Sequence, residues 1–127
     1  MFVLDKVTGN WWLLFNNEIA VGYWPKEIIP ELHAGAYLVA WGGLAVGIPK
    51  GESPPMGNGH RPNRNFTTAC YMNKVQIVNA LGRYVSPGDL KIDLDSECYG
   101  LQYYRIRNGE MVEHALLFGG PGGNCGM

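Results

Sequence analysis

The side chains able to bind a metal or act as nucleophiles are few and scattered. The sequence contains three histidines and three cysteines, which are His33, His60, His114, Cys70, Cys98 and Cys125. No two cysteines form a C-x-x-C pair, and the histidines lie far apart, so zinc-type ligand spacing is absent. We therefore expect no metal site.

Acid–base chemistry would have to come from carboxylates. Peptide hydrolysis by a carboxyl pair needs one group to take a proton from water and the other to protonate or polarise the amide. Because like charges repel, the pair must be close enough to share one proton. Glu18 stands beside an expected turn, Glu27 and Glu31 stand on an expected short helix, and Glu52 stands in a loop. For the first three, solvated surface charge is the simpler interpretation.

Four tryptophans, Trp11, Trp12, Trp24 and Trp41, have two interpretations. They line an extended peptide cleft, where aromatic rings stack on proline, or they pack in the core. Strand alternation places Trp11 and Trp12 on opposite faces of their strand.

The elements that must position these residues are mostly strands. Segments 10–15 and 18–24 predict a hairpin around Asn16-Asn17, and Asn108-Gly109 predicts a second hairpin between 99–107 and 110–118. A two-residue loop there sets Arg107 opposite Glu110 and Arg105 opposite Val112. Further strands are expected at 36–48, 66–72, 74–79 and 90–94, a short helix at 25–33, and a long Gly/Pro-rich loop at 49–65.

Composition supports a small β-rich domain. The chain has 127 residues, a formal net charge of -1, 46% hydrophobic residues, 18 glycines and 8 prolines. The high glycine and proline content indicates many turns and short strands. We therefore predict an all-β, antiparallel β-sandwich with little helix. The balanced charge gives no reason to expect nucleic acid, no apolar run is long enough for a membrane helix, and no signal peptide is visible.

Several motifs together resemble the C-terminal part of the plant neprosin-type domain. They are Thr8-Gly9-Asn10-Trp11-Trp12-Leu13, Val21-Gly22-Tyr23-Trp24-Pro25, Trp41-Gly42-Gly43, Met56-Gly57-Asn58-Gly59-His60, Cys98-Tyr99 and the closing Phe118-Gly119-Gly120-Pro121-Gly122-Gly123-Asn124-Cys125. Their order and spacing agree with that domain across nearly the whole chain. We therefore expect residues 1–127 to form a single portion of such a domain.

The resemblance implies a glutamic endopeptidase that cuts after proline. It also implies a secreted, disulfide-bonded β-sandwich without metal or organic cofactor, and a proline-containing peptide as ligand. The substrate-cleft candidates that it marks are Trp41, Gly42, Gly43, Trp24 and His60. It pairs Cys98 with Cys125, which leaves Cys70 unpaired.

Two departures from the family pattern affect catalysis. Family members carry two catalytic glutamates; one belongs to an N-terminal half that this chain lacks, and the other directly follows Trp-Gly-Gly. Here that position is Leu44, which cannot exchange a proton. Glu52 is the candidate substitute, although a loop glutamate is more often merely solvated.

Three functions remain open at this point. The chain is an active prolyl endopeptidase, a non-catalytic binder of peptide or cell-wall ligands, or a truncated product without independent function. We expect no protease activity from the chain by itself. If Leu44 is buried, glutamate there is expected to destabilise the fold. The apolar run 36–48, poor in charge, also predicts self-association through exposed strand edges.

Overall fold

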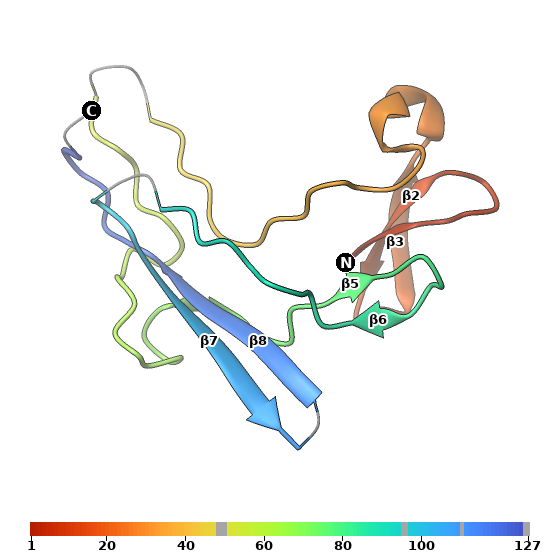
Figure 1. Cartoon of the computed structure of the whole chain (residues 1–127). Coiled ribbons are helices and arrows are strands. Elements are labelled where there is room, and N and C mark those ends of the chain that lie inside the picture. Colours follow the sequence, from red (N-terminus) through yellow and green to blue (C-terminus); the bar gives the residue numbers. More distant parts are fainter. Residues whose placement is uncertain (48–50, 95–96, 110, 126–127) are drawn as a thin grey trace. The chain divides into compact units, whose positions relative to one another are not determined.

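The computed structural model describes residues 1–47, 51–94, 97–109 and 111–125. All strand pairs among these residues are antiparallel, and the helical elements there are two 3-10 helices of three residues each (Figure 1). The all-β, antiparallel fold class predicted from the sequence is confirmed, and it is compatible with a β-sandwich. The chain divides into two compact units, residues 1–40 and 41–127, which are described separately. That the whole chain is one domain portion stays a prediction.

The first unit is a three-stranded meander. Strands β1 (Phe2–Leu4), β2 (Trp11–Phe15) and β3 (Ile19–Trp24) pair in the order β1-β2-β3. Asn16 and Asn17 turn the β2–β3 hairpin with φ values of 50° and 63°, a left-handed conformation that asparagine tolerates. The hairpin predicted at this turn is confirmed.

Aromatic residues cover both faces of this sheet. Trp12 and Tyr23 are cross-strand partners with ring centroids 4.9 Å apart, and Phe2 and Trp24 approach to 5.3 Å. The indole Nε1 of Trp11 donates a hydrogen bond to the carbonyl of Leu32 at 3.1 Å, which ties the following segment to the sheet. As alternation requires, Trp11 and Trp12 point to opposite faces.

The short helix predicted at 25–33 divides into two 3-10 turns, η1 (Lys26–Ile28) and η2 (Pro30–Leu32). Pro30 lacks a backbone N–H and disfavours helical geometry at the residue before it. Ile29 accordingly has φ -135° and ψ 57°, outside the helical region. A continuous helix was therefore the wrong expectation.

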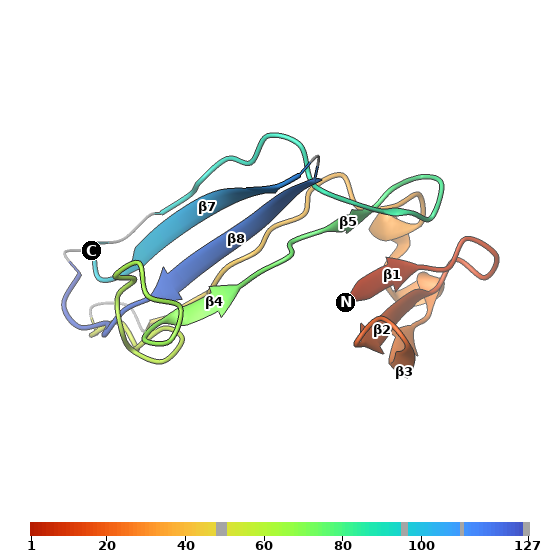
Figure 2. The same cartoon turned by 90° about the horizontal axis from the view of Figure 1, so that it is seen from below.

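The second unit is built around strand β8. Strands β4 (Cys70–Met72), β8 (Met111–Gly119) and β7 (Gly100–Asn108) pair in the order β4-β8-β7 (Figure 2). A separate two-stranded pair joins β5 (Ile77–Val78) and β6 (Tyr84–Val85). Strands predicted over 66–72 and 74–79 are thus real but shorter, because 66–68 form a turn.

The β7–β8 hairpin exists as predicted, but its register differs. Asn108 pairs with Met111, so Arg107 lies opposite Val112 and Arg105 opposite His114. The predicted cross-strand pairs, Arg107 with Glu110 and Arg105 with Val112, are therefore wrong. Gly109, which follows Asn108 in the connection between the two strands, takes a φ of 63°. A displacement by two residues preserves which side chains share a face.

The buried core of this unit centres on β8. His114, Ala115, Leu116 and Leu117 are all buried, and Leu117 is fully buried. Successive residues of a strand point to opposite faces, so burial of four in a row means that both faces of β8 are covered. Phe66 packs on one face, with its ring 5.6 Å from those of Tyr71 and Tyr104.

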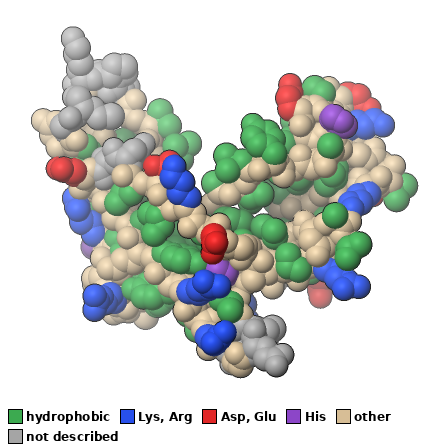
Figure 3. All heavy atoms as spheres, viewed as in Figure 1, with side chains coloured by type: hydrophobic (Ala, Val, Ile, Leu, Met, Phe, Trp, Pro, Cys, Tyr) green, Lys and Arg blue, Asp and Glu red, His purple; other side chains and the backbone are tan. Residues whose placement is uncertain are grey.

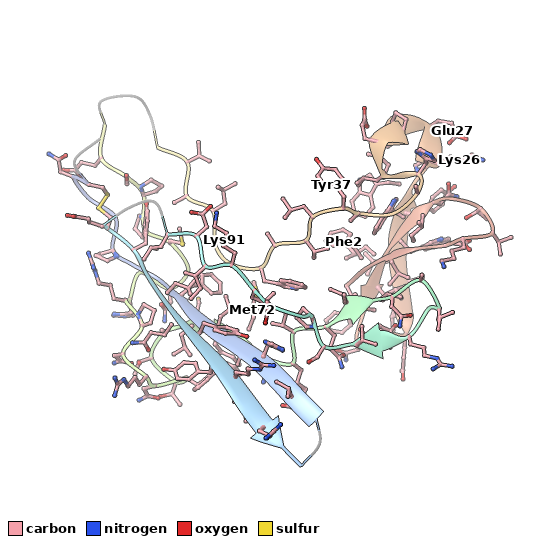
Figure 4. The ribbon with its side chains drawn as sticks, viewed as in Figure 1. Phe2, Lys26, Glu27, Tyr37, Met72 and Lys91 are labelled. Carbon is pink, nitrogen blue, oxygen red and sulfur yellow. A yellow bond between two sulfur atoms is a disulfide. The ribbon has the colours of Figure 1, made fainter. Side chains whose placement is uncertain are left out.

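Two expected strands are absent from the described residues. Residues 36–47 and 90–94 carry no strand assignment, and Ile48 lies outside the described ranges. Tyr37, which projects from its segment in Figure 4, is 93% exposed, and Ile92 is 55% exposed. Apolar composition alone does not form a strand, because the backbone groups also need a hydrogen-bonding neighbour.

Candidate functional site

Gly43 of the segment Trp41-Gly42-Gly43 lies close to Phe118, near the end of β8. A Cβ atom built on Gly43 would come within 2.5 Å of Met56 Sδ and 2.9 Å of Phe118 Cδ2. Only a residue without a side chain fits this approach without displacement. Gly43 therefore fixes the backbone of the segment on the sheet face formed by Phe118.

Leu44, the next residue, is 88% exposed. The condition under which glutamate would destabilise the fold, burial of position 44, is therefore not met. The expected destabilisation is withdrawn, because a carboxylate there would remain hydrated.

The segment that carries His60 is held at the same end of β8. Met56 and Gly120 exchange backbone hydrogen bonds of 2.9 and 3.2 Å, and Asn58 Oδ1 accepts the His60 N–H at 3.2 Å. A Cβ atom on Gly119 would lie 2.8 Å from the His60 carbonyl oxygen. The structure thus brings Gly43 and the residues 56–60 together along residues 118–120.

A polar hollow of about 530 Å³ opens beside this segment. Its lining residues are Asn58, His60, Arg61, Asn63, Thr67 and Thr68. The exposed Arg61 guanidinium donates a hydrogen bond to the Glu97 carbonyl. These amide, hydroxyl and cationic groups suit polar parts of a ligand, such as peptide carbonyl groups.

The two tryptophan candidates belong to different units. Trp41 is half-buried at the start of the second unit, directly before the two glycines. Trp24 ends β3 in the first unit, where its ring lies beside Phe2. Trp41, Gly42 and Gly43 thus belong to the same unit as His60, and Trp24 belongs to the other unit.

Glu52, the candidate substitute for the missing acid, directly precedes Ser53 in the chain. The residue is exposed, and its neighbour Ser53 pairs with Gly123 through two backbone hydrogen bonds of 2.8 Å. A Cβ atom on Gly47 would lie 3.7 Å from the Glu52 carbonyl oxygen. The backbone at Glu52 therefore lies beside Gly47, three residues after Leu44. The described contacts give its carboxylate no second carboxylate partner.

The C-terminal tail packs closely against other residues of the second unit. A disulfide joins Cys98 and Cys125, drawn as a yellow bond in Figure 4, and Cys70 is free. Gly120 and Gly122 approach the carbonyls of Cys98 and Ser53 so closely that a side chain would clash. The Tyr99 hydroxyl adds a hydrogen bond of 2.8 Å to the Pro54 carbonyl.

Sequence reasoning missed one buried polar pair, Tyr103 and His114. Their rings stack with centroids 5.7 Å apart, and a hydrogen bond joins the Tyr103 hydroxyl to His114 Nδ1. His114 is 2% exposed, and its Nε2 has no hydrogen-bond partner among the described residues. The sequence did contain a signal. In a strand, every second residue lies on the same face, so His114 shares a face with the apolar residues Val112, Leu116 and Phe118.

Within the described ranges, no three His, Cys, Asp or Glu residues gather closely enough to hold a metal ion. No helix among those residues has the length and apolar character needed to cross a bilayer. The candidate site consists of backbone groups, the aromatic side chain of Trp41, and the polar side chains around His60, among them the cationic Arg61.

These features define an antiparallel β protein with a glycine-rich tail that is fixed by a disulfide, and with a Trp-Gly-Gly segment whose last glycine lies close to Phe118. The family model described as Neprosin matches residues 1–121. The chain belongs to the neprosin family. No solved structure matches it.

Proposed function

We propose that this chain binds proline-containing peptides at the surface around Trp41–Leu44 and does not hydrolyse them. The observation that carries the proposal is Leu44, which is 88% exposed at the position where the resemblance places a catalytic glutamate. Its hydrocarbon side chain neither accepts nor donates a proton, so it cannot serve in a carboxyl pair.

The geometry next to Leu44 supports binding. Gly43 fixes the segment against Phe118, and the half-buried Trp41 stands two residues before it. A half-buried aromatic side chain three residues before an exposed leucine offers an apolar surface for a proline ring. The polar groups around His60 lie at the same end of β8 and supply hydrogen-bond partners for a peptide backbone.

The proposal includes secretion, which the family resemblance implies. The Cys98–Cys125 disulfide supports it, because such bonds persist in oxidising compartments. Extracellular peptides or cell-wall proteins rich in proline are then the ligand class. The remaining hypothesis, a product without independent function, predicts no specific binding at all.

Calorimetric titration with a peptide containing a central proline, and with its alanine counterpart, tests the proposal. We expect the proline peptide to bind more tightly and to be recovered intact by mass spectrometry. An aromatic contact contributes about 0.5–1.5 kcal/mol, so Trp41→Ala should weaken binding by about 2- to 12-fold. Trp41→Phe should retain most of the affinity.

Tyr37→Ala is the matched control, because Tyr37 is a 93% exposed aromatic residue of the first unit. The Tyr37→Ala variant should bind the proline peptide with the same affinity as the unmodified chain. Equal binding of both peptides, or equal loss in Trp41→Ala and Tyr37→Ala, would contradict the proposed site.

A further inference from the structure

The loop that leads into β4 contains an acceptor motif for N-linked glycosylation, Asn65-Phe66-Thr67. No other asparagine in the sequence is followed two positions later by serine or threonine. The motif alone is short and arises by chance in many proteins. Its surroundings decide whether a folded chain can carry a glycan there.

The side chain of Asn65 is exposed and already oriented by the threonine of the motif. Asn65 Oδ1 accepts hydrogen bonds from the Thr67 N–H at 2.9 Å and from Thr67 Oγ1 at 2.8 Å. Among the hydrogen bonds of the described residues, none uses Asn65 Nδ2. The nitrogen that would carry a sugar therefore makes no hydrogen bond among the described residues, and the side chain to which it belongs is exposed.

The middle residue of the motif anchors the loop. Phe66 packs against Tyr71 of β4 and Tyr104 of β7, with ring centroids 5.6 Å apart in both pairs. Asn65 and Thr67 on either side of it are exposed. A glycan on Asn65 therefore leaves the aromatic cluster in place.

Hydrogen bonds within the loop keep the acceptor at the surface. Asn63 Oδ1 accepts the Asn65 N–H at 3.1 Å and the Thr68 hydroxyl at 2.7 Å, and Asn58 Nδ2 donates to the Thr68 carbonyl at 3.0 Å. Figure 2 shows this loop in yellow-green, next to the start of β4. The acceptor is thus part of an ordered turn on the outside of the second unit.

We propose that Asn65 is an N-glycosylation site when the chain enters the secretory pathway. Asn65 Nδ2 attacks C1 of the first sugar of a lipid-pyrophosphate-linked oligosaccharide. The bond from C1 to the pyrophosphate oxygen breaks, the lipid pyrophosphate leaves with the electron pair, and the amide nitrogen gives one proton to a base of the transferase. No electron transfer is involved.

A glycan at this position has a consequence for the nearby surface. Thr67, which hydrogen-bonds to Asn65, also lines the polar hollow that includes His60. The sugar chain would therefore stand beside that hollow and restrict which ligands reach it. This inference does not depend on peptide binding, because it concerns Asn65 alone.

Cell-free translation with endoplasmic-reticulum microsomes tests the site directly. The full chain is given a cleavable signal peptide, and only protease-protected, translocated chains are counted. We expect a slower-migrating form that an N-glycosidase removes. This readout requires neither correct folding nor secretion from cells.

Variants separate the motif from its neighbourhood. Asn65→Gln and Thr67→Ala should abolish the slower form, while Thr67→Ser should retain it. Asn73→Gln, at an exposed asparagine outside any motif, is the matched control and should be modified like the parent chain. Translocated parent chain without an N-glycosidase-sensitive form, or a form that survives Asn65→Gln, would overturn the proposal.

Discussion

The backbone of Gly43 lies close to the ring of Phe118 and to the side chain of Met56. Gly43 lies in a coil segment, and Phe118 lies near the end of β8, 75 residues later in the chain. This contact fixes the position of the exposed Leu44. It therefore connects the packing of the second unit to the proposed binding surface.

Gly43→Ala is expected to destabilise the fold. The added methyl group would overlap Met56 and Phe118, and overpacking of this kind costs about 1–3 kcal/mol. Chemical denaturation followed by tryptophan fluorescence measures the difference. Gly22→Ala is the control, because a Cβ atom there meets nothing within 4 Å. Equal midpoints for the two variants would contradict the close contact.

Loss of the disulfide is expected to cost more than loss of the free thiol. Cys98 and Cys125 are separated by 27 residues, and closing a loop of that size contributes about 3–4 kcal/mol in the chain-entropy estimate. Thermal unfolding should therefore occur at lower temperature for Cys98→Ser/Cys125→Ser. Cys70→Ser should change it less. Peptide mapping that found Cys70 bridged to either partner would refute the pairing.

The Tyr103–His114 pair is expected to be energetically coupled. Tyr103→Phe leaves the buried His114 Nδ1 without its hydrogen bond, at a cost of about 1–3 kcal/mol. The double variant Tyr103→Phe/His114→Leu should lose less than the sum of the single variants, since both polar partners are removed. Tyr71→Phe, at a 50% exposed ring, is the control. Strict additivity in urea denaturation would exclude coupling.

Strand β3 is the surface from which we expect self-association. It is the outer strand of its sheet, and its six residues carry no charge. Ile19, Val21 and Tyr23 are 60%, 63% and 52% exposed. Hydrophobic side chains, green in Figure 3, make up much of the surface on the face shown there. Val21→Lys should shift light-scattering mass toward the monomer, because a lysine on an edge strand opposes pairing.

Val7→Lys makes the same substitution at a 94% exposed valine outside the strands and should leave the mass distribution unchanged. A monomeric parent chain, or an equal response of both variants, would remove β3 as the associating edge. The original expectation placed this liability in 36–48, but the described part of that run is not a strand.

Local signals predicted the hairpins, because Asn16-Asn17 and Asn108-Gly109 act within a few residues of the strands they join. The prediction of strands at 36–48 and 90–94 was wrong for a different reason. Hydrophobic content identifies residues that prefer burial, but a strand also requires a neighbour, and sequence alone does not supply that neighbour. The hairpin register failed because a two-residue difference leaves the hydrophobic pattern unchanged.

The site was predictable only in part. The Trp-Gly-Gly and Gly-His segments and the cysteine pair were marked by resemblance, and the structure places these segments along one end of β8 and joins the cysteines. The exposure of Leu44 and the burial of His114 depend on contacts between residues far apart in sequence. Neither follows from the residue type, since leucine is usually buried and histidine usually is not.

The most direct test of the account is mass spectrometry of a proline-containing peptide after incubation at acidic pH. Three proteins are compared, which are the parent chain, Leu44→Glu, and Leu44→Glu joined to a neprosin-type N-terminal half that carries the other glutamate. Because Leu44 is exposed, the substitution should change stability by less than about 0.5 kcal/mol, which makes its activity interpretable.

We predict intact peptide with the first two proteins and cleavage after proline only with the third, since one carboxylate has no partner with which to share a proton. Cleavage after proline by the parent chain would contradict the account. Glu52→Gln would then show whether Glu52 supplies the missing acid.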